Sequence, residues 1–137
     1  MAQHQMTFVA SQIEEQIAFR GDPTNYQAGD AAWWSMPSFK NNGESRLDAL
    51  ERDGGHWRGQ VIILPDGTLN MMATWYPVAD GHDSVQFAGP IIKGQTCYVS
   101  IVGGTGRYAG ARGEAKATAT MSDKDTPLYI YEITLTT

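Results

Sequence analysis

The sequence is poor in cysteine, in charged residues and in long apolar runs, and each shortage excludes a class of protein. Cys97 is the only cysteine in 137 residues, so no internal disulfide framework can form and a reducing compartment fits. Charged residues make up 18% of the chain, and the net charge is -5. Because no block of basic residues is present to neutralise phosphates, we expect neither a nucleic-acid partner nor a membrane partner.

The N-terminal residues carry no pattern of a targeting signal. They lack a basic n-region, and the apolar run at 8–10 is far too short for a signal-peptide core or a spanning helix. We therefore expect a cytoplasmic protein. A chain of this length suits one hydrophobic core rather than two, so we expect a single domain over residues 1–137.

Turns rich in glycine divide the chain into short segments with the two-residue alternation of β-strands. Apolar runs at 57–64 and 68–76 flank a Pro-Asp-Gly sequence at 65–67, which predicts a compact hairpin. Residues 6–19 also alternate in kind and favour one strand, although their Gln and Glu content lets a helix compete. Seven to nine short strands without a convincing long helix predict an all-β sandwich or barrel.

One glycine-rich segment, Gly104-x-Gly106-x-x-Ala109, satisfies a loose dinucleotide-binding pattern. That pattern needs a helix N-terminus behind it to hold the pyrophosphate. The residues from 114 onward instead alternate with the period of a strand. We therefore interpret the segment as a turn between two strands.

The residue types that bind metals or act as nucleophiles are scattered. His4, His56 and His82 form no ligand pair at helix or turn spacing, so we expect no metal and no cofactor. No Gly-x-Ser-x-Gly motif marks a serine nucleophile. Cys97 lies in a β-rich run, and we interpret it as a small buried apolar residue rather than a reactive thiolate.

The second half of the chain carries a pattern shared by two known families. Phe-Ala-Gly-Pro at 87–90 is followed, within 96–115, by a predicted strand, a Gly-Gly-Thr-Gly turn at 103–106 and a small-residue strand that opens with Gly113. This pattern resembles allene oxide cyclases and dirigent proteins. The resemblance implies a calycin-like, closed antiparallel eight-stranded β-barrel that assembles as a homotrimer or homodimer.

The first predicted strand is more faintly similar to allene oxide cyclases. There a buried glutamate is followed by an asparagine two residues later and by Arg-Gly-x-Pro; here Glu14, Gln16 and the segment 20–23 stand at those spacings. The resemblance implies that Glu14 is a catalytic carboxylate in the lumen and that Gln16 replaces the asparagine that helps to hold a water. Period-two geometry independently puts both side chains on one face. A solvated Glu14 on the barrel exterior is the alternative.

Aromatic and methionine residues are numerous, with four tryptophans and six methionines. A small barrel must fill its interior, yet polarisable and adaptable walls also suit an apolar ligand. Tyr76 is a third catalytic candidate beside Glu14 and Gln16. The candidate substrate-binding residues are Trp33, Trp34, Met36, Met71, Trp75, Tyr98, Tyr129 and Tyr131.

These features predict a cofactor-independent cyclase or isomerase of natural-product biosynthesis. It would fold a hydrophobic unsaturated intermediate, derived from a polyketide or a fatty acid, for intramolecular ring closure. Holding reacting atoms at attack distance is worth roughly 7–11 kcal/mol in favourable model reactions, so such an enzyme needs no cofactor. The alternative is a non-catalytic dirigent-like or lipocalin-like protein that only binds a small molecule.

Overall fold

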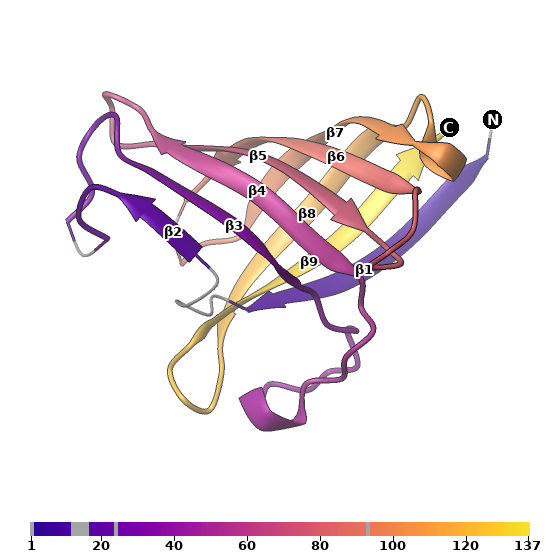
Figure 1. Cartoon of the computed structure of the whole chain (residues 1–137), viewed down its shortest axis with the longest axis horizontal. Coiled ribbons are helices and arrows are strands. Elements are labelled where there is room, and N and C mark those ends of the chain that lie inside the picture. Colours follow the sequence, from indigo (N-terminus) through magenta and orange to yellow (C-terminus); the bar gives the residue numbers. More distant parts are fainter. Residues whose placement is uncertain (1, 12–16, 24, 93) are drawn as a thin grey trace.

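The computed structural model describes residues 2–11, 17–23, 25–92 and 94–137. Its described segments form one antiparallel sheet of nine strands with short 3-10 helices (Figure 1). The elements, in chain order, are β1 (Gln3–Ser11), β2 (Ile17–Arg20), β3 (Ala31–Pro37), η2 (Leu47–Ala49), β4 (His56–Ile63), β5 (Leu69–Tyr76), β6 (Ser84–Ile91), β7 (Cys97–Thr105), η3 (Gly106–Tyr108), β8 (Arg112–Met121) and β9 (Pro127–Thr136). None of these helices is long and apolar enough to cross a bilayer.

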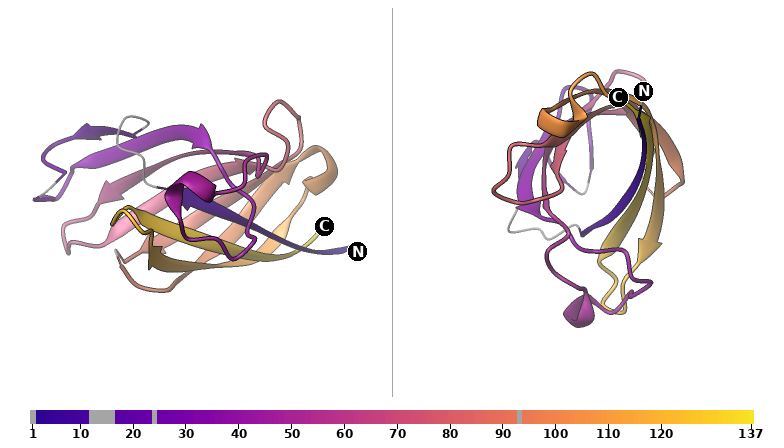
Figure 2. Two further views of the ribbon diagram at one scale, coloured as in Figure 1. Left: turned by 90° about the horizontal axis from the view of Figure 1, so that it is seen from below. Right: turned by 90° about the vertical axis from the view of Figure 1, so that its right-hand side faces the viewer.

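The sheet is a meander with one exception. Strands β2 to β9 follow one another in space as in sequence, whereas β1 pairs with β9 at the far edge. The sheet curls around its own inner face, as the end-on view in Figure 2 shows. Along the described residues no ladder joins the edge strands β1 and β2, and an isolated bridge between Val9 and Phe39 spans the gap. Its two backbone hydrogen bonds are both 2.8 Å long.

The all-β, antiparallel prediction is confirmed, but the closed eight-stranded barrel is wrong. The observed fold is a nine-stranded half-barrel. The strand predicted over residues 6–19 is divided between β1 and β2, which lie on opposite edges of the sheet. Among the described residues β2 has four residues and pairs with β3, and no ladder joins it to β1 to close the curl.

Turn chemistry explains the register of the central strands. The hairpin predicted at 65–67 joins β4 to β5, with the Gly67 N–H donating to the Leu64 carbonyl at 2.8 Å and a φ of 86° at Gly67. That positive φ is accessible to glycine without steric cost. After β7, the glycine-rich segment ends in the three-residue helix η3 and the chain enters β8 at Arg112. The long helix that a dinucleotide site requires is therefore replaced by a turn.

Aromatic rings fill one part of the space inside the curl. Phe8 of β1 is stacked between Trp75 and Tyr131, with ring centroids 4.6 and 4.8 Å away. Trp57 and Phe87 meet edge to face at 5.4 Å. We call these five rings the aromatic plug. Such contacts add to the apolar burial, so this part of the interior is solidly packed.

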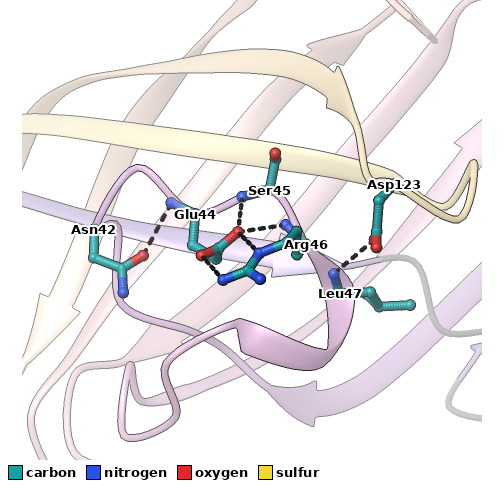
Figure 3. A network of polar contacts seen from close by, with 6 residues as sticks. All are labelled: Asn42, Glu44, Ser45, Arg46, Leu47 and Asp123. Carbon is teal, nitrogen blue, oxygen red and sulfur yellow. Dashed lines mark hydrogen bonds and ion pairs between the residues drawn. The ribbon is translucent and has the colours of Figure 1, made fainter.

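A loop covers the outer face of β1 and β9. The loop is the segment 38–55 between β3 and β4. Its residues Phe39 and Leu50 pack on Val9 of β1 and Leu128 of β9 in a second apolar cluster. Figure 3 shows how the loop is attached: Asp123, in the turn between β8 and β9, accepts the backbone N–H of Leu47 at 2.9 Å. These contacts fix the loop against β1 and β9, and Phe39 is thereby placed where it forms the bridge to Val9 of β1.

Candidate functional site

A cavity of about 450 Å³ occupies the other part of the curl. Its lining includes Ser11 at the end of β1, Ile17 of β2, Leu69 at the start of β5 and Ile91 at the end of β6. These strand ends lie on the side that carries β2, on the left of Figure 1. The cavity thus lies at the end of the half-barrel that carries β2.

Small residues leave room for Trp34, whose ring lines the cavity. Trp34, Gly59 and Ala73 stand side by side on β3, β4 and β5. A Cβ atom at Gly59 would lie 2.6 Å from the Cζ2 atom of Trp34, so the indole occupies the space that a side chain at this position would take. A larger side chain here would have to displace that ring.

The floor of the cavity is aromatic. Trp57 and Tyr131 belong to the plug and also line the cavity, and their ring centroids are 5.0 Å apart. Trp34 lies 6.0 Å from Trp57 and extends this surface up the wall. Ring faces of this kind bind apolar and unsaturated groups and stabilise developing positive charge.

Tyr131 crosses the interior from β9 to β5. Its hydroxyl group donates to the Sδ atom of Met71 at 3.8 Å, which is a long contact to a weak acceptor. Burial raises the pKa of Tyr131 well above its ordinary range. Burial also raises the pKa of Tyr129, although a hydrogen bond from the Gly94 backbone acts in the opposite direction. Both phenols therefore stay protonated at neutral pH and can donate.

Two further polar atoms are buried beside the cavity. Ser11 Oγ and Trp34 Nε1 have no hydrogen-bond partner in the described part of the chain, and neither is open to solvent. A buried group without a partner costs about 1–3 kcal/mol. These two unpaired groups therefore lower the free energy of unfolding relative to an apolar wall of the same shape.

Charge is absent from the described lining of the cavity. It contains no Asp, Glu, Lys, Arg or His, and tyrosines are its only ionisable residues. Throughout the described ranges, no group of three or more His, Cys, Asp and Glu residues could hold a metal ion. The described site can thus offer aromatic surface and neutral hydrogen bonds.

Solved structures with the same architecture include two dirigent proteins. The pterocarpan synthase dirigent protein GePTS1 matches with a TM-score of 0.76 and 18% identity, over 98% of this chain and 84% of that chain. The pterocarpan synthase dirigent protein PsPTS1 matches with a TM-score of 0.74 and 20% identity, over 98% and 94%. The fold is dirigent-like. A pyocyanin demethylase also matches, with a TM-score of 0.68 and 19% identity, over 98% and 100%.

These likenesses show the fold alone, because the identities are 20% or lower. No family model matches the sequence, and no curated protein matches it. The resemblance to dirigent proteins inferred from the glycine-rich pattern is therefore confirmed for the fold. A shared fold does not determine the activity of this chain.

Within the dirigent-like half-barrel, part of the predicted wall lies around the cavity. The predicted residues in its lining are Trp34, Met36, Met71, Tyr129 and Tyr131. Trp33 and Tyr98 lie instead on the outer face, 47% and 54% exposed, because adjacent residues of a strand point to opposite sides. The structure thus places both residues outside the lumen, and their predicted role in substrate binding stays a prediction. The predicted homotrimer or homodimer stays a prediction.

Trp75 and Tyr76 also lie away from the cavity lining. Trp75 is part of the plug, and its indole N–H is shared between Ser38 Oγ at 3.1 Å and the Gly54 carbonyl at 3.0 Å. Tyr76 lies beneath the Arg58 guanidinium, 5.1 Å from its ring centroid. Neither residue lies in the described lining of the cavity, and their predicted roles in binding and catalysis stay predictions.

Glu14 and Gln16 lie outside the described residues. Ser11 and Ile17, which flank their segment in the sequence, both line the cavity. Sequence reasoning also missed Trp57 and Gly59. Trp57 shares the parity of Val61, an apolar residue of the same strand, which is a signal that could have placed it inside. Gly59 carried no such signal.

Proposed function

We propose that this chain is a cofactor-independent cyclase or isomerase that binds an apolar, unsaturated small molecule in the cavity of the half-barrel. The intermediate would derive from a polyketide or a fatty acid, as in natural-product biosynthesis. The enzyme would fold it so that the atoms that close the ring approach each other. Ring closure by isomerisation only moves bonds within one molecule, so no atoms are gained or lost.

The cavity itself is the observation that carries this proposal. Its volume of about 450 Å³ lies within the roughly 300–1,000 Å³ typical of ligand pockets. The ring faces of Trp34, Trp57 and Tyr131 can hold an unsaturated chain in a bent conformation. Such positioning lowers the barrier by replacing a search among conformers with one prepared geometry.

The tyrosines supply hydrogen-bond donors for this chemistry. A protonated phenol of Tyr129 or Tyr131 can polarise a carbonyl or epoxide oxygen as charge develops on it. Glu14 and Gln16 are retained in the proposal as the carboxylate and its polar partner, to be tested by substitution. Two proteins of similar fold are named for transformations, a pterocarpan synthase and a pyocyanin demethylase, which supports a catalytic role.

The test is a search for conversion without change of mass. The purified full chain is incubated with unsaturated polyketide- and fatty-acid-derived compounds, allylic epoxides included, and the products are separated by chiral chromatography with mass detection. A new peak of unchanged mass, enriched in one enantiomer and absent with heat-denatured protein, is expected. Saturable binding of these compounds without any such peak would contradict catalysis.

A non-catalytic binding protein is the second candidate. One observation favours it: among the described lining residues only tyrosines can exchange protons. A dirigent-like or lipocalin-like protein needs no more than a shaped apolar cavity to orient its ligand. The same incubation separates the two candidates, because such a protein would bind its ligand and return it unchanged.

A further inference from the structure

We infer that the cavity selects an uncharged guest bearing one hydrogen-bond acceptor, such as a carbonyl or ether oxygen, and that the Tyr131 hydroxyl group donates to that acceptor. This inference rests on the proposed function, since it names the chemical class of the small molecule that the same cavity binds. Tyr131 thereby acts as the residue that orients the guest.

The exclusion of charge follows from the lining. No Asp, Glu, Lys, Arg or His lies in its described part, and the proposed function adds only the Glu14 carboxylate, so an anionic guest would leave water without gaining an opposite charge. Burying an unpaired charge is far more costly than burying a carbonyl group that receives a hydrogen bond. A neutral guest is therefore preferred over the corresponding carboxylate.

Tyr131 is assigned as the hydrogen-bond donor because the present partner of its hydroxyl group is a weak one. Its hydroxyl group contacts Met71 Sδ at 3.8 Å, while an O–H···O bond is normally 2.5–3.0 Å long. Both residues line the cavity. A thioether is a poor acceptor and a methionine side chain moves easily, so an oxygen atom of a guest can replace the sulfur contact.

The position of this donor is fixed. The Tyr131 ring is stacked at 4.8 Å on Phe8 with an interplanar angle of 7°, and it also meets Trp57 at 5.0 Å. Tyr131 is 4% exposed. A rigid ring that carries one O–H group across the interior defines where the acceptor of the guest must lie.

A matched set of rigid probes tests this selectivity. Fluorene has no acceptor, 9-fluorenone adds one carbonyl group, and fluorene-9-carboxylate adds a charge. Each probe displaces the neutral dye N-phenyl-1-naphthylamine from the full chain at pH 7. We expect the ketone to bind about five- to tenfold more tightly than fluorene, the gain of one well-made hydrogen bond. The carboxylate should bind at least about tenfold more weakly than the ketone.

Tyr131→Phe keeps the ring and removes the donor. We expect it to bring the affinity for the ketone to that for fluorene while the affinity for fluorene changes less than about twofold. Tyr98→Phe, on the exposed outer face, is the control and should leave the preference intact. The carbonyl stretch of bound fluorenone should move to lower wavenumber in the wild-type chain and not in Tyr131→Phe.

The outcomes separate this inference from the proposed function. A preference for the ketone that survives in Tyr131→Phe, or that disappears in Tyr129→Phe instead, would overturn the assignment of the donor. Equal binding of ketone and carboxylate would overturn the selection against charge. If neither the dye nor any probe bound, the proposed function and this inference would both be contradicted.

Discussion

The indole ring of Trp34 packs closely against Gly59. The two residues are opposite each other in the β3–β4 ladder, and a Cβ atom on the glycine would come within 2.6 Å of both the indole Cζ2 atom and Ala73 Cβ. The absence of a side chain at this position of β4 therefore leaves room for a large aromatic ring on β3 that lines the cavity.

Gly59→Val should close the cavity from its wall. The added methyl groups must displace the Trp34 indole, so we expect at least about tenfold weaker displacement of N-phenyl-1-naphthylamine by fluorenone and about 1–3 kcal/mol loss of unfolding free energy from overpacking. Gln60→Val, at the next position of β4 and on its exposed face, is the matched control. Unchanged affinity in Gly59→Val with a stable fold would contradict the geometry of this wall.

Alkaline pH should destabilise the protein through Tyr131. Burial raises the pKa of this phenol above the ordinary value of 10.0. The folded state therefore keeps the proton to higher pH than the unfolded chain, so the stabilisation is complete below about pH 10 and is lost progressively above it. The loss approaches about 1.4 kcal/mol per pH unit for one group.

Urea unfolding between pH 8 and pH 11 measures this effect. The unfolding free energy of the wild-type chain should be flat to about pH 9.5 and then fall. Tyr131→Phe should show a shallower fall, whereas Tyr98→Phe, with its exposed ring, should behave as wild type. Identical alkaline slopes in wild type and Tyr131→Phe would mean that the phenol is not held in its neutral form.

Much of the sheet could be predicted because its strands obey simple rules. In β4 and β5 the alternation of apolar and polar residues matches the observed burial, and the Pro-Asp-Gly turn between them needs a positive φ that only Gly67 supplies easily. Local chemistry of this kind is visible in the sequence. The glycine-rich pattern at 103–113 led likewise to the dirigent-like fold.

The remaining features depend on where the chain goes after a strand ends. Alternation from residue 6 to 19 is the same whether the segment stays in one strand or crosses to the other edge of the sheet, as β1 and β2 do. Adjacent Trp33 and Trp34 must point to opposite faces, and composition does not say which one enters the lumen. Ser11 shows the same limit, because a serine at a strand end is common and its burial depends on distant neighbours.

Glu14→Gln should separate catalysis from binding. The substitution keeps the size of the side chain and removes its charge, so turnover of a converted substrate should fall by about 100-fold or more if the carboxylate assists proton transfer or stabilises charge. Binding of fluorenone should change less than about threefold, since its contacts in the proposal are with Tyr131 and the aromatic floor. Parallel loss of turnover and binding would favour a structural role for Glu14, and unchanged turnover would remove it from the mechanism.

Two buried serines should respond in opposite ways to loss of their hydroxyl groups. Ser38 and Ser11 are each 1% exposed. Ser38 Oγ donates to the Gly54 carbonyl at 2.6 Å and accepts the Trp75 indole N–H at 3.1 Å, so Ser38→Ala should cost about 1–2 kcal/mol of unfolding free energy.

Ser11 Oγ has no partner among the described residues, so Ser11→Ala should leave the unfolding free energy unchanged or raise it slightly. Urea unfolding of both variants beside the wild type measures the difference. Because a hydroxyl group stabilises a fold only when its hydrogen bonds are made, equal destabilisation of the two variants would show that Ser11 is bonded in the folded chain. The Ser11 hydroxyl group would then be held by a hydrogen bond within the protein and could not donate to a guest in the cavity.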